Sequence, residues 1–160
     1  NYPMGAASST RGLMAASTGP SNTKAIDFVT ISTLGDGADF GDTQVIQGGA
    51  GASNSTRAIF AGGYDIPAAT NTIEFTTIAT LGNTADFGDL TTKRRGLGGV
   101  ASPTRACFAG GDSPGDVNII DFVEISTTGN ATDFGDLTLA SSSNGKKKNV
   151  SGCSNGHGGL

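Results

Sequence analysis

Short runs of alternating large and small residues are the main pattern along the chain. Residues 57–62 alternate in this way and end at a glycine doublet, and residues 72–79 are rich in β-branched and aromatic side chains. Both patterns are typical of β-strands. Residues 86–90 and 96–102 complete a group of four short segments separated by turn residues. No apolar period of 3.6 residues occurs, so the sequence predicts an all-β protein with almost no helix.

The four-strand pattern occurs three times. The string Asp-Phe-Gly-Asp begins at Asp39, Asp86 and Asp133, at intervals of 47 residues. A fixed period of this length indicates a repeat architecture. We expect one repeat domain over residues 1–160, with units at about residues 3–43, 46–91 and 94–138, followed by a link, a partial strand and a glycine-rich tail over 139–160.

Composition narrows the class of protein further. The chain has 160 residues, of which 26 are glycine, 36% are hydrophobic and 15% are charged, and its net charge is −4. The glycines follow no triplet period, which excludes collagen, and no apolar run is long enough for a membrane span. An acidic chain is also a poor candidate for a general nucleic-acid binder.

The repeat resembles the kelch-type β-propeller blade. In that pattern a small, glycine-containing inner strand precedes a hydrophobic strand that ends in a glycine doublet, and a strand with an aromatic residue and an outer strand follow. Residues 96–102, 105–111, 118–126 and 133–137 keep this order. The outer-strand tryptophan of the family is absent, with phenylalanine in its place, and Ala16-Ser17 replaces the doublet in the first copy. The amino-acid sequence of the repeats also resembles that of glycine-rich structural proteins of tailed marine phages, especially cyanophages. This resemblance implies a virion or extracellular location.

A ring of three blades would be incomplete, because known propellers have at least four. Residues 147–155 align with 94–102 and resemble the inner strand of a fourth unit. An open end would expose strand edges and apolar faces. We therefore expect a homo-oligomer or association with other virion proteins, unless a longer parent chain supplies further blades.

Two sets of residues recur at equivalent positions and are predicted to be structural. The arginines are predicted to pair with a carboxylate such as Asp27, Glu74 or Asp121, with a ring of sites for an anionic ligand as the alternative. The outer-strand phenylalanines are predicted to insert between blades, and Phe28, Phe75 and Phe122 are predicted to be buried too. The two sets are Arg11, Arg57 and Arg105, and Phe40, Phe87 and Phe134.

Segments that differ between the copies, and clusters of basic residues, are the candidates for a ligand or partner surface. The links at residues 17–23, 64–71 and 112–118 differ most between copies and are expected to share one face. Basic residues gather at equivalent places in adjacent units, where acidic glycans or an acidic partner would suit them; a solvated loop is the alternative. The candidate surface residues are Tyr64, Lys93, Arg94, Arg95, Lys146, Lys147 and Lys148.

No catalytic set is recognisable. The repeated aspartate pairs are predicted to serve turn chemistry, with calcium as the alternative. Cys107 and Cys153 align with small hydrophobic residues and are predicted to lie in the core, and the single histidine, His157, has no partner for hydrolase chemistry. We therefore expect no enzyme, cofactor, nucleic-acid binding or membrane insertion. The hypothesis is a non-enzymatic structural protein of a phage tail, fibre or capsid surface, and the alternative is a receptor- or glycan-binding module for host attachment.

Overall fold

Three four-stranded antiparallel sheets make up the described chain. The computed structural model describes residues 3–17, 23–44, 47–112, 115, 117–138 and 150–153. These residues contain no helix, and so no helix that is long and apolar enough to cross a membrane. Sheet 1 comprises β1 (Met4–Ala7), β2 (Arg11–Ser17), β3 (Thr23–Thr30) and β4 (Ala38–Asp42); sheet 2 comprises β5 (Ala50–Ser53), β6 (Arg57–Asp65), β7 (Ala68–Thr77) and β8 (Ala85–Asp89); sheet 3 comprises β9 (Gly98–Ala101), β10 (Arg105–Ala109), β11 (Ile119–Glu124) and β12 (Thr132–Asp136). The all-β prediction and the four-strand repeat are confirmed.

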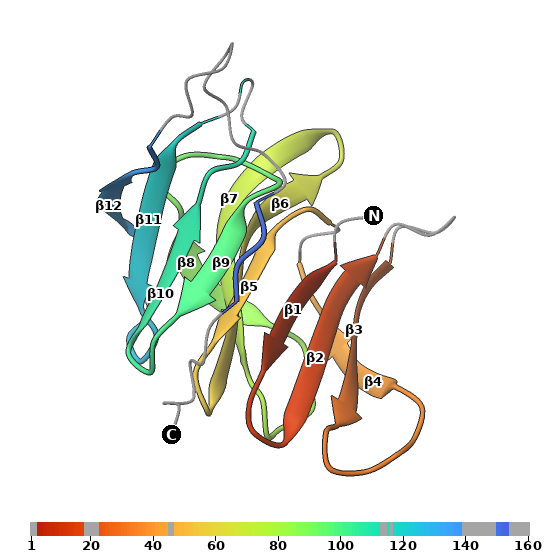
Figure 1. Cartoon of the computed structure of the whole chain (residues 1–160). Helices are drawn as coiled ribbons and strands as arrows, with labels where there is room; N and C mark the ends of the chain where they lie inside the picture. Colours follow the sequence, from red (N-terminus) through yellow and green to blue (C-terminus); the bar gives the residue numbers. More distant parts are fainter. Residues whose placement is uncertain are drawn as a thin grey trace.

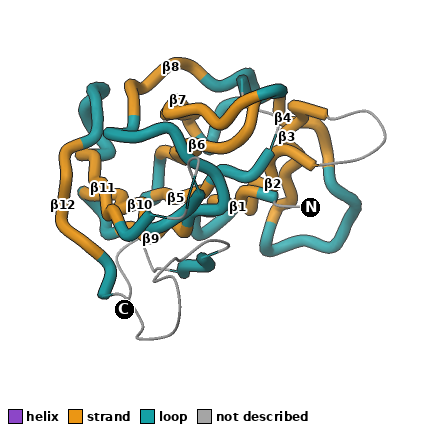
Figure 2. Tube along the Cα trace, turned by 90° about the horizontal axis from the view of Figure 1, so that it is seen from above, coloured by secondary structure: helices purple, strands orange, loops and turns teal. Residues whose placement is uncertain are grey.

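The strands of each sheet pair in chain order, so each sheet is an up-and-down meander. The sheets stand side by side, with sheet 2 between the other two (Figure 1). Seen from above, the first strands β1, β5 and β9 lie together, and the fourth strands β4, β8 and β12 lie around the outside (Figure 2). The described residues therefore form a fan in which the extensive packing is between sheets 1 and 2 and between sheets 2 and 3.

The first strands approach one another so closely that only glycine fits. A Cβ atom on Gly51 would overlap the carbonyl oxygen of Gly5, and one on Gly99 would overlap the carbonyl oxygen of Gly51. The same contact recurs once more, because a Cβ on Gly152 would overlap the carbonyl oxygen of Gly99. Residues 150–153 thus lie against β9 where the first strand of another sheet would lie, and the amide of Val150 donates to the carbonyl of Gly96 at 3.3 Å.

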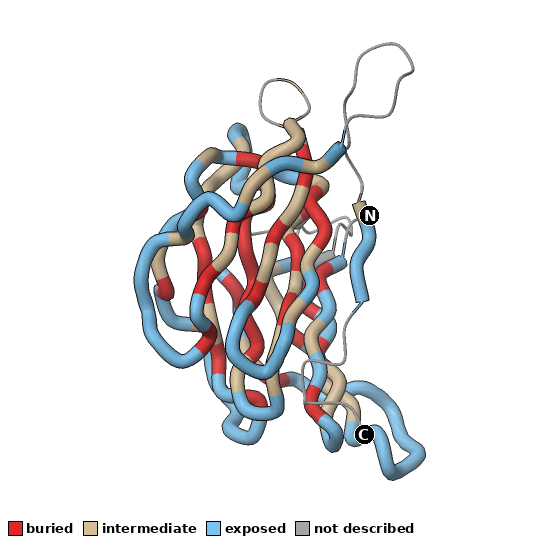
Figure 3. The backbone as a smooth tube through the Cα atoms, turned by 60° about the vertical axis from the view of Figure 1, so that its left-hand side comes forward, coloured by how far each residue is buried: buried red, intermediate tan, exposed pale blue. Residues whose placement is uncertain are grey.

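Burial follows from the place of each sheet in the fan. Two apolar clusters fill the spaces between sheets 1 and 2 and between sheets 2 and 3. Buried segments lie in the middle of the molecule, and most of the connecting turns are exposed (Figure 3). The central part of β6, residues 58–63, is buried on both faces, because sheet 2 is covered on both sides. This explains its continuous run of apolar and glycine residues, which a sheet with one solvated face would not need.

The β6–β7 hairpin is longer than the sequence predicts. Tyr64 pairs with Ala69 and Asp65 pairs with Ala68, so most of the expected link over residues 64–71 is strand. The register shifts between Ala61 and Gly63, at the glycine doublet. The doublet therefore does not end the strand; it introduces a bulge, after which the hairpin continues.

Candidate functional site

The two junctions between sheets are built from the same contacts. We call the side of a sheet that faces the following sheet its trailing face, and the side that faces the preceding sheet its leading face. On the trailing faces of sheets 1 and 2, Phe40 and Phe87 are each only 2% exposed. Each meets a second phenylalanine edge to face, with ring centroids 6.1 Å apart for Phe28 and 5.7 Å apart for Phe75. The prediction that Phe40 and Phe87 insert between sheets is confirmed, whereas Phe28, Phe75 and Phe122 are half-buried.

The recurring arginines bridge the junctions in a way that differs from the prediction. The guanidinium of Arg11 lies 4.7 Å from the ring centre of Phe28 and donates from Nη1 to the carbonyl of Ile78 in sheet 2 at 2.9 Å. Arg57 repeats both contacts, lying over Phe75 and donating to Ile125 in sheet 3. The expected carboxylate partners of Arg11 and Arg57 are therefore replaced by an aromatic face and a carbonyl of the next sheet.

The repeated Asp-Phe-Gly-Asp strings form the outer part of each junction. A turn of the following sheet runs along them, and its glycine amides donate to the phenylalanine carbonyls, Gly82 to Phe40 at 2.8 Å and Gly129 to Phe87 at 2.7 Å. The next turn residue is an asparagine whose Oδ1 accepts from the second aspartate amide, Asn83 from Asp42 and Asn130 from Asp89. The strings thus hold the incoming turn through their backbone atoms, in addition to the inserted phenylalanine, and a side chain at Gly41 or Gly88 would overlap that turn.

Each junction also contains a buried carboxylate at the same repeat position. Glu74 and Asp121 are fully buried. Glu74 accepts from the amide of Gln44 at 2.7 Å, and Asp121 accepts from the amide of Thr91 at 3.1 Å. A buried carboxylate therefore receives a backbone amide from the segment that leaves the preceding sheet.

Arg94 is the largest correction to the predicted surface. It is fully buried, so it does not belong to the basic patch. Its Nη2 lies 2.9 Å from Asp121, and its other bonds go to the carbonyls of Phe108, Gly110 and Ile119. Its Nε has no hydrogen-bond partner among the described residues. Burial lowers the pKa of Arg94, and the nearby Asp121 carboxylate opposes that effect.

The outer faces of sheets 1 and 3 carry residues at the same repeat positions as the junction residues, but no described sheet packs on these faces. On the trailing face of sheet 3, Phe134 is 58% exposed, so its predicted burial is wrong. Arg105 lies over Phe122 but pairs with Glu124 at 2.6 Å, and this ion pair is exposed. On the leading face of sheet 1, Met14 is 44% and Ile31 is 56% exposed, whereas their counterparts at the two junctions are buried. These counterparts are Phe60 and Phe108 for Met14, and Ile78 and Ile125 for Ile31.

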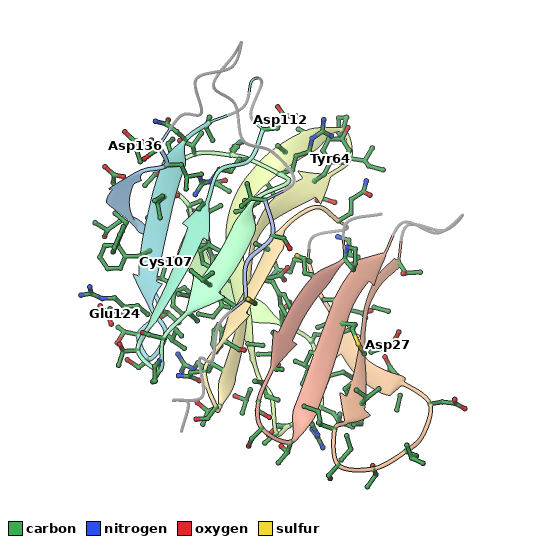
Figure 4. The ribbon with its side chains drawn as sticks, in the orientation of Figure 1. Asp27, Tyr64, Cys107, Asp112, Glu124 and Asp136 are labelled. Atoms are coloured by element: carbon green, nitrogen blue, oxygen red, sulfur yellow. The ribbon has the colours of Figure 1, made fainter. Side chains whose placement is uncertain are left out.

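Three of the other candidate surface residues, Tyr64, Lys93 and Arg95, lie together beside the β6–β7 hairpin. Tyr64 and Asp112 come close together there (Figure 4), and they line an open depression of about 290 Å³ with Lys93 and Arg95. The guanidinium of Arg95 lies 4.9 Å from the ring centre of Tyr64 and 3.6 Å from the Asp112 carboxylate. Lys146, Lys147 and Lys148 lie outside the described residues, as does most of the predicted link over 17–23.

The cysteines and the aspartates offer no metal centre in the described part of the chain. No group of three or more His, Cys, Asp or Glu side chains there could hold a metal ion. Cys107 and Cys153 are not paired. Cys107 is partly buried, and burial raises the pKa of its thiol while Arg105 opposes the rise. Cys153 is exposed, which corrects its predicted place in the core.

No protein-family model matches the chain, and no curated protein matches its sequence. The interpretation of the site therefore depends on its geometry. Sequence reasoning missed the role of Arg94, because nothing in the local sequence separates it from its basic neighbours Lys93 and Arg95. It also missed the difference between Phe134 and its two counterparts, which arises from position in the fan and not from local sequence.

Proposed function

We propose that the chain is a non-enzymatic structural protein, built from kelch-like propeller blades, that assembles into a virion or another extracellular particle. The single observation that carries this proposal is that the same set of contacts occurs at both junctions between sheets. Each junction combines an inserted phenylalanine, an arginine donating to the next sheet, a glycine turn and a buried carboxylate. Residues that make the same contacts at both junctions favour a stacking role, because ligand sites usually differ between repeats.

The order of strands supports the blade interpretation. Four antiparallel strands in chain order, with the first strands gathered on one side and the fourth strands outside, are the arrangement expected of propeller blades. The end faces carry apolar residues at the same repeat positions as the junctions, and exposed apolar faces of this kind mark association sites.

Location in a particle is the direct test. An antibody against the chain, applied to fractions of the source culture, should detect the protein in the particle or extracellular fraction. Immunogold labelling should then place it on the particle surface. Detection only as a free protein inside cells would overturn the proposal.

A glycan-binding role is the second candidate, and the depression beside Tyr64 favours it. An aromatic ring beside a cation and a carboxylate offers stacking and hydrogen bonds to an acidic sugar. Saturation-transfer NMR with sialylated and uronic-acid oligosaccharides would test this role. Binding should be lost in Arg95→Ala and retained in Arg105→Ala, which removes an exposed arginine from another part of the surface. Equal binding by both variants would refute a site at this depression.

A further inference from the structure

The exposed trailing face of sheet 3 is an unfinished junction. At both internal junctions a glycine turn of the next sheet packs against the outer-strand glycine, whereas no described atom lies within 4 Å of the position of a Cβ on Gly135. Phe134 is 58% exposed where Phe40 and Phe87 are 2% exposed. Ile120 and Cys107 are half-buried, although Ile73 and Ile59 at the same positions of sheet 2 are fully buried.

The leading face of sheet 1 is the complementary half of such a junction. Met14 and Ile31 occupy the positions of side chains that are buried in sheets 2 and 3, and here they are exposed. The turn before β4 contains Gly35 and Asp36 at the positions of Gly82 and Asn83. A side-chain oxygen is thus present at the place where Asn83 accepts from the amide of Asp42. Asp27 stands at the position of the buried carboxylates and is exposed.

We propose that the leading face of sheet 1 of a second copy of this chain packs on the trailing face of sheet 3, forming a third junction of the same type. This inference rests on the proposed function and names the partner. Because the two faces differ, the contact is heterologous: each copy keeps one free face, and the assembly grows head to tail until the rotation closes it. The occupant is a second copy because sheet 1 itself offers the residue types that both internal junctions bury.

The contacts of the third junction follow from the internal ones. Phe134 would insert beside Met14 and Ile31 of the second copy, as Phe40 inserts beside Phe60 and Ile78. The Arg105 guanidinium would turn from Glu124 to the carbonyl of Ile31, as Arg11 bonds that of Ile78. The exposed ion pair of Arg105 contributes little, so exchanging it costs little.

Residues 150–153 occupy the place that the incoming β1 would take. This segment is held by the bond from Val150 to Gly96 and by the close contact of Gly152 with Gly99. The four residues of β1 carry Gly5 at the position of Gly152 and bring a whole sheet with them. The incoming strand therefore displaces residues 150–153.

A mixing experiment with full-length variants tests the proposal. Sedimentation velocity over a range of concentrations should show self-association of the natural chain. Phe134→Asp places a charge on the trailing face of sheet 3, and Ile31→Asp places one on the leading face of sheet 1. Each variant should weaken self-association about tenfold or more, because an aspartate would be buried without a partner. Both positions are exposed in the single chain, so the variants should fold. An equimolar mixture of the two variants should form a one-to-one complex, since each retains the face that the other lacks.

The matched control is Leu81→Asp, because Leu81 is 56% exposed, as Ile31 is, yet stays exposed beside an internal junction. It should self-associate like the natural chain. A natural chain that stays monomeric at all concentrations, a mixture that fails to associate, or a control that is as weak as Ile31→Asp would each overturn the proposal. Self-association without particle localisation would instead contradict the proposed function alone, and particle localisation of a chain that stays monomeric would contradict this inference alone.

A second measurement examines the displaced segment. Gly152→Ala should expel residues 150–153 from β9, because its Cβ would overlap the Gly99 carbonyl, and self-association should become tighter. Ser151→Ala is the control, since Ser151 is exposed. Weaker association of Gly152→Ala would show that the segment belongs to the junction and would refute displacement.

Discussion

Replacement of Arg94 by methionine should cost the protein a large part of its stability. The methionine keeps the length of the buried side chain but removes the cation beside Asp121 and the four hydrogen bonds of the guanidinium. Asp121 is fully buried, and without Arg94 its carboxylate keeps the two hydrogen bonds from the amide and the hydroxyl of Thr91. Breaking one side of a buried ion pair in this way costs on the order of 3–5 kcal/mol. A domain of this size has a total stability of roughly 5–15 kcal/mol, so the loss is severe.

Urea unfolding followed by circular dichroism measures this loss. The control is Arg95→Met, because Arg95 is the next residue and its ion pair with Asp112 is largely exposed, so its change should stay within about 1 kcal/mol. In the double variant Arg94→Met with Asp121→Leu the total cost should fall below the sum of the single costs by about 2 kcal/mol or more, because no charge is left buried alone. A loss below about 1 kcal/mol in Arg94→Met, or additive costs in the double variant, would refute the argument.

Three further perturbations follow from the junctions. Phe87→Ala should cost about 3–5 kcal/mol in urea unfolding, whereas Phe134→Ala in the monomer should cost under about 1 kcal/mol, and equal losses would contradict the different burial of the two rings. Gly51→Ala should lower the melting temperature by several degrees because its Cβ overlaps a carbonyl, while Gly5→Ala, whose Cβ would meet nothing closer than 3.9 Å, should change it little; similar shifts would contradict the close strand contact. Burial raises the pKa of Cys107, so its contribution to stability is complete below pH 9.0 and falls as the pH rises above that value. The natural chain should therefore lose more stability than Cys107→Ala between about pH 8 and about pH 10, and parallel losses would contradict the raised pKa.

The sequence alone predicts the strands well but the burial of single residues less well. The 47-residue period, the turn residues and the β-branched segments locate all three sheets, because these are local signals. They also identify Phe40 and Phe87 as inserted rings. Phe134 has the same local sequence and is exposed, since its burial depends on a following sheet and not on its neighbours along the chain.

The polar residues were predicted least well. Arg94 sits in a basic run, Lys93-Arg94-Arg95, which is typical of a solvated surface. Only the fold brings it beneath β10 and β11, where Asp121 and three carbonyls receive it. Arg11 and Arg57 recur at equivalent positions, but their partners, a ring and a carbonyl beyond their own sheet, leave no sign in the local sequence. Long-range partners of this kind are set by packing geometry, which local patterns do not record.

In the fan arrangement the interfaces between sheets follow one another in a linear series. Sheet 2 shares an interface on both sides, while sheets 1 and 3 each share one, so stability behaves as a sum of sheet terms and nearest-neighbour terms. In such a system the ends open first and the centre last, and hydrogen exchange should be slowest along β6. The same property makes length adjustable: a further unit of 47 residues inserted beside sheet 2 would replace one junction by two of the same type, adding one sheet and one interface. Such a protein can lengthen or shorten by whole repeat units, while the contacts at each junction between sheets stay of the same type.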